Sequence, residues 1–294
     1  MSKCNICPRN CNIDRNSSKG FCLTTNDILI SKVMLHQHEE PMLTNNHDKG
    51  SGAIFFAGCN LKCVYCQNYD ISHNPTGKTV SVKELVEIFK KLEENGAGNI
   101  DLVTPTHYSK QIIEALKIYK PKIPVIWNSS GYEKSSTIKK LKGLVDIYLV
   151  DFKYAFDELA NKYSKTKDYV KNAKKVLKEI KKQQKCNFYN ENKLVKGIIV
   201  RHMVLPSHTE NSKECLNIIK SILGEETIVS LMSQYVPMGE AENFPEINRK
   251  LNKLEYKIVL SHALKLNLNN CLIQELDSAS SEYTPDFNSQ IFEI

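Results

Sequence analysis

Seven of the ten cysteines fall into two short clusters near the start of the chain, at spacings that suit metal binding. The first cluster consists of Cys4, Cys7, Cys11 and Cys22, and the second of Cys59, Cys63 and Cys66. In a reducing compartment disulfides do not persist, so clustered thiols favour metal or iron–sulfur binding. The isolated cysteines, which we expect to be small core residues, are Cys186, Cys215 and Cys271.

The second cluster has the spacing C-x3-C-x2-C and lies on one loop, directly after a predicted strand. Three thiolates can hold three corners of a four-iron cluster. The fourth iron would then lack a protein ligand, and an open coordination position is typical of catalytic metal sites. The alternative is a zinc site that a distant His or Cys completes.

The first cluster supplies four potential ligands between residues 4 and 22. Four thiolates can close a tetrahedral zinc site or hold an iron–sulfur cluster. A small segment with few apolar residues needs such a metal to become ordered. We therefore expect zinc or a second iron–sulfur cluster here, between which the spacing does not decide. The alternative is a set of free reduced thiols on a flexible arm.

Beyond residue 50, apolar runs alternate with helical patterns. The predicted strands are residues 53–57, 100–103, 124–127, 145–150, 197–205, 228–232 and, as one more candidate, 271–274. The predicted helices are residues 81–95, 109–118, 133–141, a lysine-rich stretch that ends near 185, 211–222 and 247–266. This order predicts an α/β fold with a parallel sheet covered by helices, as a barrel or an open sheet. The polar motifs follow the strands, where such sheets place their sites.

Composition sets the broad class. The chain has 294 residues, of which 41% are hydrophobic and 25% charged, so it is globular rather than disordered. It lacks an apolar run long enough to span a membrane and an apolar N-terminus typical of a signal peptide, so we expect a cytoplasmic protein without membrane contact. A net charge of +7 is too small to indicate nucleic acid by itself. The lysines of residues 162–185 have little aromatic interleaving and predict a solvated helix face.

With Tyr65 two residues after the second cysteine, the loop reads C-x3-C-x-aromatic-C and resembles the motif of the radical S-adenosylmethionine (SAM) superfamily. The resemblance covers the chain from residue 50 onward. Other sequence segments resemble the subgroup related to pyruvate formate-lyase activating enzymes, most of whose members lack an assigned substrate. These segments are residues 52–59, 66–69, 104–108, 128–132, 151–153, 201–202 and 234–235. The resemblance implies a partial (β/α)6 TIM-like barrel over residues 50–294, preceded by a cysteine-rich extension over residues 1–49.

The resemblance also implies an activity. A [4Fe-4S] cluster on Cys59, Cys63 and Cys66 would cleave SAM reductively to a 5′-deoxyadenosyl radical, which removes a hydrogen atom from a substrate. The leading expectation for that substrate is a glycine of a glycyl-radical enzyme, with flavodoxin or ferredoxin as electron donor. The alternative is a zinc-stabilised basic module that binds RNA or a protein partner without redox chemistry.

The resemblance assigns cofactor contacts at the strand ends. Where the family has Gly-Gly-Glu for the SAM amino group, this chain has Thr104, Pro105, Thr106 and His107, and no carboxylate replaces the glutamate. The threonines and backbone carbonyls can still accept from an ammonium; the alternative is a turn without a ligand role. Tyr65, at the aromatic position of the motif, is a further cofactor-binding candidate. Asn128, Ser129 and Ser130 are candidates for the ribose, and Arg201 for the SAM carboxylate. The alternative for residues 128–130 is a polar cap on the next helix, and the alternative for Arg201 is a structural ion pair.

Asp151 and Lys153 are the predicted catalytic residues. They follow a predicted strand two positions apart and so point to the same side. The similar Asp-x-Lys of activating enzymes faces the SAM and peptide pocket, whereas the alternative role is a salt bridge only. Residues 36–41, His-Gln-His-Glu-Glu-Pro, are expected to form a solvated turn rather than a site at the barrel mouth.

Overall fold

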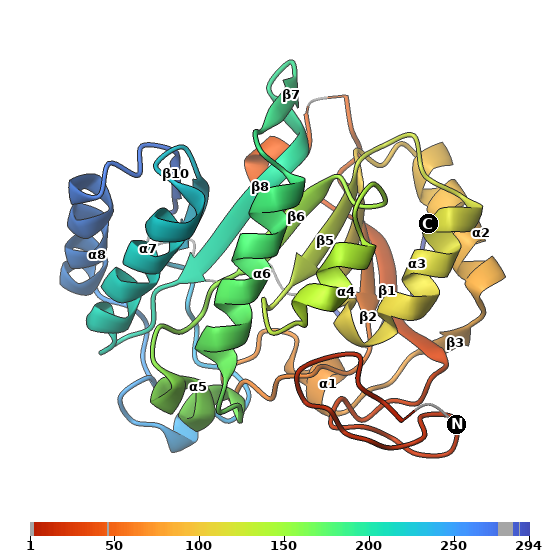
Figure 1. Cartoon of the computed structure of the whole chain (residues 1–294), viewed down its shortest axis with the longest axis horizontal. Helices are drawn as coiled ribbons and strands as arrows, with labels where there is room; N and C mark the ends of the chain where they lie inside the picture. The colour runs from red at the N-terminus through yellow and green to blue at the C-terminus, as the bar shows by residue number, and fades with distance from the viewer. Residues whose placement is uncertain (1–2, 46, 276–284, 288) are drawn as a thin grey trace.

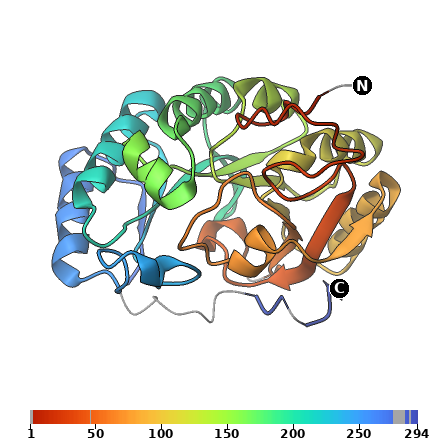
Figure 2. The ribbon, with the colours of Figure 1, turned by 90° about the horizontal axis from the view of Figure 1, so that it is seen from below.

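The computed structural model describes residues 3–45, 47–275, 285–287 and 289–294, which form one curved sheet with helices on its outer side (Figures 1 and 2). The strand order is β10-β9-β8-β6-β5-β4-β2-β1-β11. The strands from β2 to β10 in this order are mutually parallel; they are β2 (Ser51–Phe56), β4 (Ile100–Val103), β5 (Val125–Ser129), β6 (Ile147–Asp151), β8 (Lys193–Met203), β9 (Ile228–Met232) and β10 (Cys271–Ile273). The predicted α/β partial barrel is confirmed.

The helices lie in an arc along the convex side of the sheet, as Figure 2 shows. They are α2 (Val82–Glu94), α3 (Ser109–Ile118), α4 (Ser135–Lys140), α6 (Tyr169–Gln183), α7 (Thr209–Leu223) and α8 (Lys253–Lys265). Two further helices, α1 (Tyr69–His73) and α5 (Asp157–Ser164), follow the carboxyl ends of β2 and β6. None of the helices in the described ranges is long and apolar enough to cross a membrane.

Local chemistry accounts for the helix boundaries. Helix α2 begins with a capping box, in which Ser81 accepts from the N–H of Glu84 and the Glu84 carboxylate accepts from the N–H of Ser81. Helix α8 has the same device at Asn252 and Glu255, so it begins at Lys253 rather than at the predicted residue 247. The lysine-rich stretch is two helices, α5 and α6, because the backbone at Lys165 turns into the left-handed region.

Strand β1 (Ile28–His36) is the main element that the sequence analysis missed. It pairs antiparallel with β2, so the first fifty residues contribute to the sheet although they lack the βα rhythm. Strands β3 (Lys78–Val80) and β11 (Phe292–Glu293) pair with β1, and β7 (Phe188–Asn190) pairs with β8. The domain boundary between residues 49 and 50 stays a prediction, since β1 before it pairs with β2 after it.

The connection between β1 and β2 closes the amino end of the partial barrel. Its short turn η1 (Pro41–Leu43), red-orange beside β8 in Figure 1, buries Leu43 completely among residues such as Ile126 and Leu149 of the sheet. Asn99 donates to the carbonyl of Leu43 at 2.8 Å. Residues 3–25, red in Figure 1, lie at the opposite end, beside the carboxyl ends of the parallel strands.

Candidate functional site

A cavity of about 650 Å³ lies on the concave side of the sheet. The three cysteines of the loop 59–66 line one wall, and residues from the ends of β2, β4, β5, β6, β8 and β9 line the others. The predicted site residues that line it besides the cysteines are Tyr65, Thr104, Asn128, Ser129, Ser130, Asp151, Lys153 and Arg201. The structure therefore brings together most of the side chains proposed from the sequence.

Each sulfur of this loop has a hydrogen-bonding neighbour. Cys59 Sγ accepts from the N–H of Leu61 at 3.4 Å, and Cys66 Sγ accepts from the hydroxyl of Ser72 at 3.4 Å. Cys63 Sγ lies 2.9 Å from the hydroxyl of Ser164. Burial raises the pKa of Cys59 to about 12, so metal binding has to supply the driving force for deprotonation. Three thiols on one loop, with Cys63 buried, Cys59 and Cys66 partly buried and donors aimed at the sulfurs, fit a [4Fe-4S] cluster that keeps one iron open.

The hydroxyl beside Cys63 belongs to a buried chain. Ser164 lies at the end of α5, and its Oγ is 2.7 Å from the hydroxyl of Tyr154. The hydroxyl of Tyr154 is in turn 2.5 Å from that of Tyr65, the aromatic residue of the motif. The sequence gives no signal for this contact, since 101 positions separate Cys63 from Ser164.

A charged network crosses the cavity floor. Arg201 in β8 donates from Nε to Asp151 at 2.9 Å and from Nη2 to the amide oxygen of Asn128 at 2.6 Å. Asn128 donates to Asp101 Oδ2 at 3.1 Å. Two edges of the guanidinium therefore bind protein side chains, Asp151 and Asn128. This geometry is the structural ion pair that was the alternative for Arg201. A contact with the SAM carboxylate stays a prediction.

Asp151 and Lys153 also form an ion pair, with Nζ 2.7 Å from Oδ2. Although burial acts in the opposite direction, Lys153 and Arg201 hold the pKa of Asp151 below its usual value. Lys153 stays charged because the attraction of Asp151, followed by that of Cys63, outweighs burial and raises its pKa. The pair presents its charged atoms in the cavity wall beside the cysteine loop.

Residues 36–41 do not form the solvated turn that was expected. Glu39 Oε2 lies 3.6 Å from Arg201 Nη1, and the side chain of Glu39 is only 13% exposed. Glu40 is buried, whereas Gln37 and His38 are exposed. Burial and the neighbouring Asp101 raise the pKa of Glu39. The expectation failed because η1 turns the connection inward, beneath the cavity.

The turn after β4 differs from the prediction in part. Thr104 lines the cavity and holds φ at +60°, a strained conformation for a β-branched residue. Thr106 and His107 are buried away from it: the Thr106 hydroxyl donates to Glu133 at 2.9 Å, and His107 Nε2 lies 2.8 Å from the carbonyl of Ala57. The predicted cofactor contacts of these two side chains therefore have no support in this geometry.

Glu133, in the loop after β5, is the residue that the sequence analysis missed beside this turn. Its fully buried carboxylate accepts from Thr106, from Trp127 Nε1 at 2.9 Å and from the Ser129 hydroxyl at 2.8 Å. It joins the loops after β4 and β5 that carry the proposed cofactor contacts.

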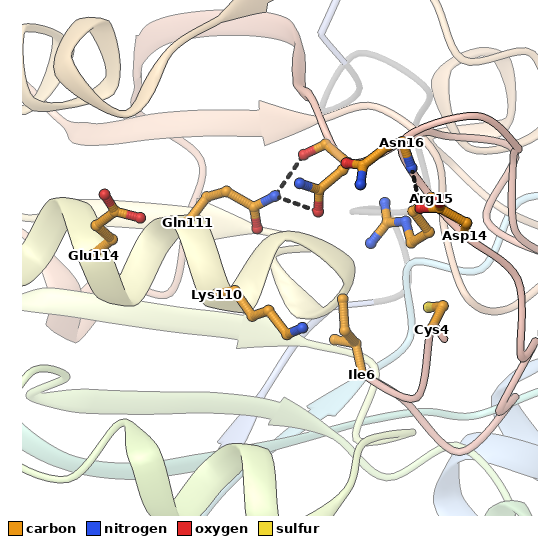
Figure 3. Close-up of a pocket in the computed structure, with 9 residues that line it drawn as sticks. Cys4, Ile6, Asp14, Arg15, Asn16, Lys110, Gln111 and Glu114 are labelled. Atoms are coloured by element: carbon orange, nitrogen blue, oxygen red, sulfur yellow. Dashed lines mark hydrogen bonds between the residues drawn. The ribbon is translucent and has the colours of Figure 1, made fainter. Parts of the chain in front are cut away.

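The N-terminal cysteines lie beside the cysteine loop. Cys7, Cys11 and Cys22 are mutual neighbours, whereas Cys4 lines a separate cavity of about 260 Å³ between residues 4–26 and helix α3 (Figure 3). Within the described residues, no three His, Cys, Asp or Glu side chains converge on a single metal-ion position. The predicted zinc ion or second iron–sulfur cluster stays a prediction.

Comparison with known proteins agrees with this geometry. The model of the radical SAM superfamily matches residues 53–217. An uncharacterised protein of Methanocaldococcus jannaschii is 33% identical over 278 residues, covering 92% of this chain and 76% of that protein. The pyruvate formate-lyase-activating enzyme of Clostridium pasteurianum is 28% identical over 222 residues, covering 70% of this chain and 81% of the relative. The structure of Streptococcus suis SuiB bound to S-adenosylmethionine matches 70% of this chain at 14% identity with a TM-score of 0.49, and this chain spans 44% of its length. The family model matches more than half of the chain, and the Methanocaldococcus jannaschii protein is 33% identical over 92% of it. The chain therefore belongs to the radical SAM superfamily.

Proposed function

We propose that this radical SAM enzyme removes a hydrogen atom from a protein substrate, at a glycine of a glycyl-radical enzyme. The observation that carries the radical chemistry is the loop 59–66, whose three thiols line a cavity opposite polar strand ends. The protein substrate is supported by the similarity to a pyruvate formate-lyase-activating enzyme over 70% of the chain. Family membership favours this function over the zinc-stabilised binding module.

The chain's own residues would divide the work as follows. Cys59, Cys63 and Cys66 would hold the [4Fe-4S] cluster, and the polar strand ends that line the same cavity would hold SAM. When bound together, these two cofactors supply a radical that can remove hydrogen from an unactivated carbon. Apolar residues of the cavity wall keep water from that radical; they are Phe55, Val103, Met203, Met232 and Leu272.

Lys153 and Asp151 are placed to orient the substrate or SAM rather than to exchange protons. Their ion pair keeps both groups charged, with the pKa of the aspartate lowered and that of the lysine raised. A charged pair on the wall offers an ammonium donor and a carboxylate acceptor, which suit the amide groups of an extended peptide.

The cluster is tested with protein reconstituted under anaerobic conditions. Wild type is expected to give the paramagnetic signal of a reduced four-iron cluster, perturbed by SAM, and to cleave SAM. Changing Cys59, Cys63 and Cys66 together to Ala should abolish all three observations, whereas Cys186→Ala should leave them intact. Cys186 lies outside both clusters and is exposed, so the expectation that it is a core residue was wrong. A triple variant with full iron and an unchanged SAM response would refute the assignment.

The substrate is tested separately. The reduced enzyme and SAM are incubated with candidate glycyl-radical enzymes from the same cell, with flavodoxin or ferredoxin as the reductant. A glycyl-radical signal that requires the cysteine loop supports the proposal. Modification of a small molecule or an RNA, without a glycyl radical in any candidate, contradicts the substrate while leaving the radical SAM chemistry in place.

A further inference from the structure

Two thiols of the N-terminal segment lie beside Gly20, and a third lies near them. The sulfurs of Cys11 and Cys22 each lie 3.5 Å from the position that a Cβ atom would take at this glycine. The thiol of Cys7 is buried and has Cys22 and Cys11 as neighbours. Residues that are 4 to 15 positions apart in sequence thus present their thiols to one small region.

Each of these sulfurs has a hydrogen-bond partner of the kind that metal-bound thiolates use. The N–H of Phe21 donates to Cys11 Sγ at 3.4 Å, and the hydroxyl of Thr24 lies 3.2 Å from Cys22 Sγ. The backbone of Arg9 and the side chain of Asn60 hydrogen-bond to Cys7. Such contacts stabilise the deprotonated sulfur and orient it as a ligand.

The same segment is fastened to the loop that carries the radical cluster. Arg9 donates from Nε to the carbonyl of Asn60 at 2.8 Å and from Nη2 to the carbonyl of Ser164 at 3.3 Å. Asn60 directly follows Cys59, and the hydroxyl of Ser164 contacts Cys63. Residue 58 must be glycine, at φ +80°, because the carbonyl of Cys22 lies where its side chain would be.

We propose that residues 4–22 bind a thiolate-held metal centre, zinc or iron, and that this centre holds the radical-cluster loop in place through Arg9. Cys7, Cys11 and Cys22 lie near one another and would draw together on the metal, and Cys4 would complete the set by turning from the wall of the cavity in Figure 3. Cysteine thiolates bind zinc and iron–sulfur clusters in preference to harder metal ions. The segment buries few apolar side chains, Ile6 among them, so the metal supplies the stability that a core would otherwise provide.

The experiment compares metal content in the full chain. In a variant with Cys59, Cys63 and Cys66 changed to Ser, the radical cluster is absent, and stoichiometric zinc or iron that survives dialysis against EDTA supports the proposal. That metal should disappear when Cys11 and Cys22 are also changed to Ser and should persist with Cys186→Ser. Zinc identifies a single-ion site and iron with a visible charge-transfer spectrum identifies a cluster. Absence of both metals, or equal metal after loss of Cys11 and Cys22, overturns the proposal.

A second measurement serves if the variant that lacks five cysteines does not fold. The variant with the three loop cysteines changed to Ser is stripped of metal and titrated anaerobically with Co²⁺. Thiolate-to-cobalt absorption that is reduced by the single change Cys22→Ser supports the site, and absence of such absorption overturns it.

The holding role is tested with Arg9→Ala in the protein that carries both centres. We expect the N-terminal metal to remain while a chelator removes the radical-cluster iron several-fold faster than in wild type. Arg249→Ala, at an exposed arginine that pairs with Glu255, is the matched control and should leave the rate unchanged. Equal release rates in wild type and Arg9→Ala overturn the holding role.

Discussion

Replacing Ser164 by Ala tests whether the buried hydroxyl chain tunes the radical cluster. A cluster-bound Cys63 can only accept a hydrogen bond, so Ser164, 2.9 Å away, must donate to it. The hydroxyl of Tyr154, 2.7 Å from Ser164, must then donate to the serine, and Tyr65 to Tyr154 at 2.5 Å. Cluster binding thus fixes the direction of every bond in the chain.

The magnitude follows from the charge on the sulfur. A hydrogen bond to a charged group contributes about 1.5–3 kcal/mol, and an added electron on the cluster strengthens it. A difference of about 0.5–1.4 kcal/mol between the two oxidation states corresponds to about 20–60 mV for a one-electron couple. Because the reduced cluster loses more than the oxidised one, Ser164→Ala should lower the reduction potential by this amount.

A redox titration followed by electron paramagnetic resonance measures the shift in reconstituted protein. Tyr154→Phe keeps the bond from Ser164 to Cys63 and should give a smaller shift of the same sign. Ser212→Ala, at a fully buried serine of α7 that bonds to the carbonyl of His208, is the matched control and should give none. An unchanged potential in Ser164→Ala with a full complement of iron would refute the reasoning.

The remaining predictions concern stability and are measured by urea unfolding. Asp151→Ala leaves two partly buried cations, Lys153 and Arg201, without their shared partner and should cost about 1.5–3 kcal/mol, against at most about 0.5 kcal/mol for Glu87→Ala in an exposed pair; equal losses would contradict this. Glu133→Ala strands three buried donors and should cost about 3 kcal/mol or more, whereas Glu133→Gln keeps an acceptor and should cost less than half as much; similar losses would argue against the network. Thr104→Gly relieves backbone strain at φ +60° worth about 1–2 kcal/mol, and the added chain entropy of glycine costs about 0.5–1 kcal/mol, so the stability should stay the same or rise slightly. A marked loss of stability would show that the Thr104 side chain is needed.

The parallel strands were predictable because they are short apolar runs between turn residues. The observed β4 (Ile100–Val103) and β9 (Ile228–Met232) coincide with the predicted residues, since both strands are buried on both faces. Strand β1 (Ile28–His36) was missed because it belongs to no βα unit and its place depends on antiparallel pairing with β2. Pairing between strands is a tertiary property that local periodicity does not encode.

The candidate site likewise has features that the sequence predicts and features that depend on tertiary contacts. The cysteine loop was predictable because its three cysteines lie within a stretch of eight residues, so the spacing alone carries the signal. The contacts of Ser164 and Glu133 were not readable, since each depends on loops after different strands meeting in space. The burial of Glu39 was missed because a charged run is usually solvated, and here Arg201 on the sheet offsets its burial.

Ser164 joins the two parts of the molecule through two different atoms, which makes their roles separable. Its hydroxyl contacts Cys63, and its carbonyl accepts from Arg9 of the N-terminal segment. Ser164→Ala removes the hydroxyl and keeps the carbonyl, so it should lower the cluster potential without speeding the release of cluster iron. Arg9→Ala does the reverse, because it frees the carbonyls of Asn60 and Ser164 while the hydroxyl stays in contact with the sulfur. If both variants changed both quantities equally, tuning and holding would be one property of the loop's packing, and the assignment of separate roles to the two atoms would fail.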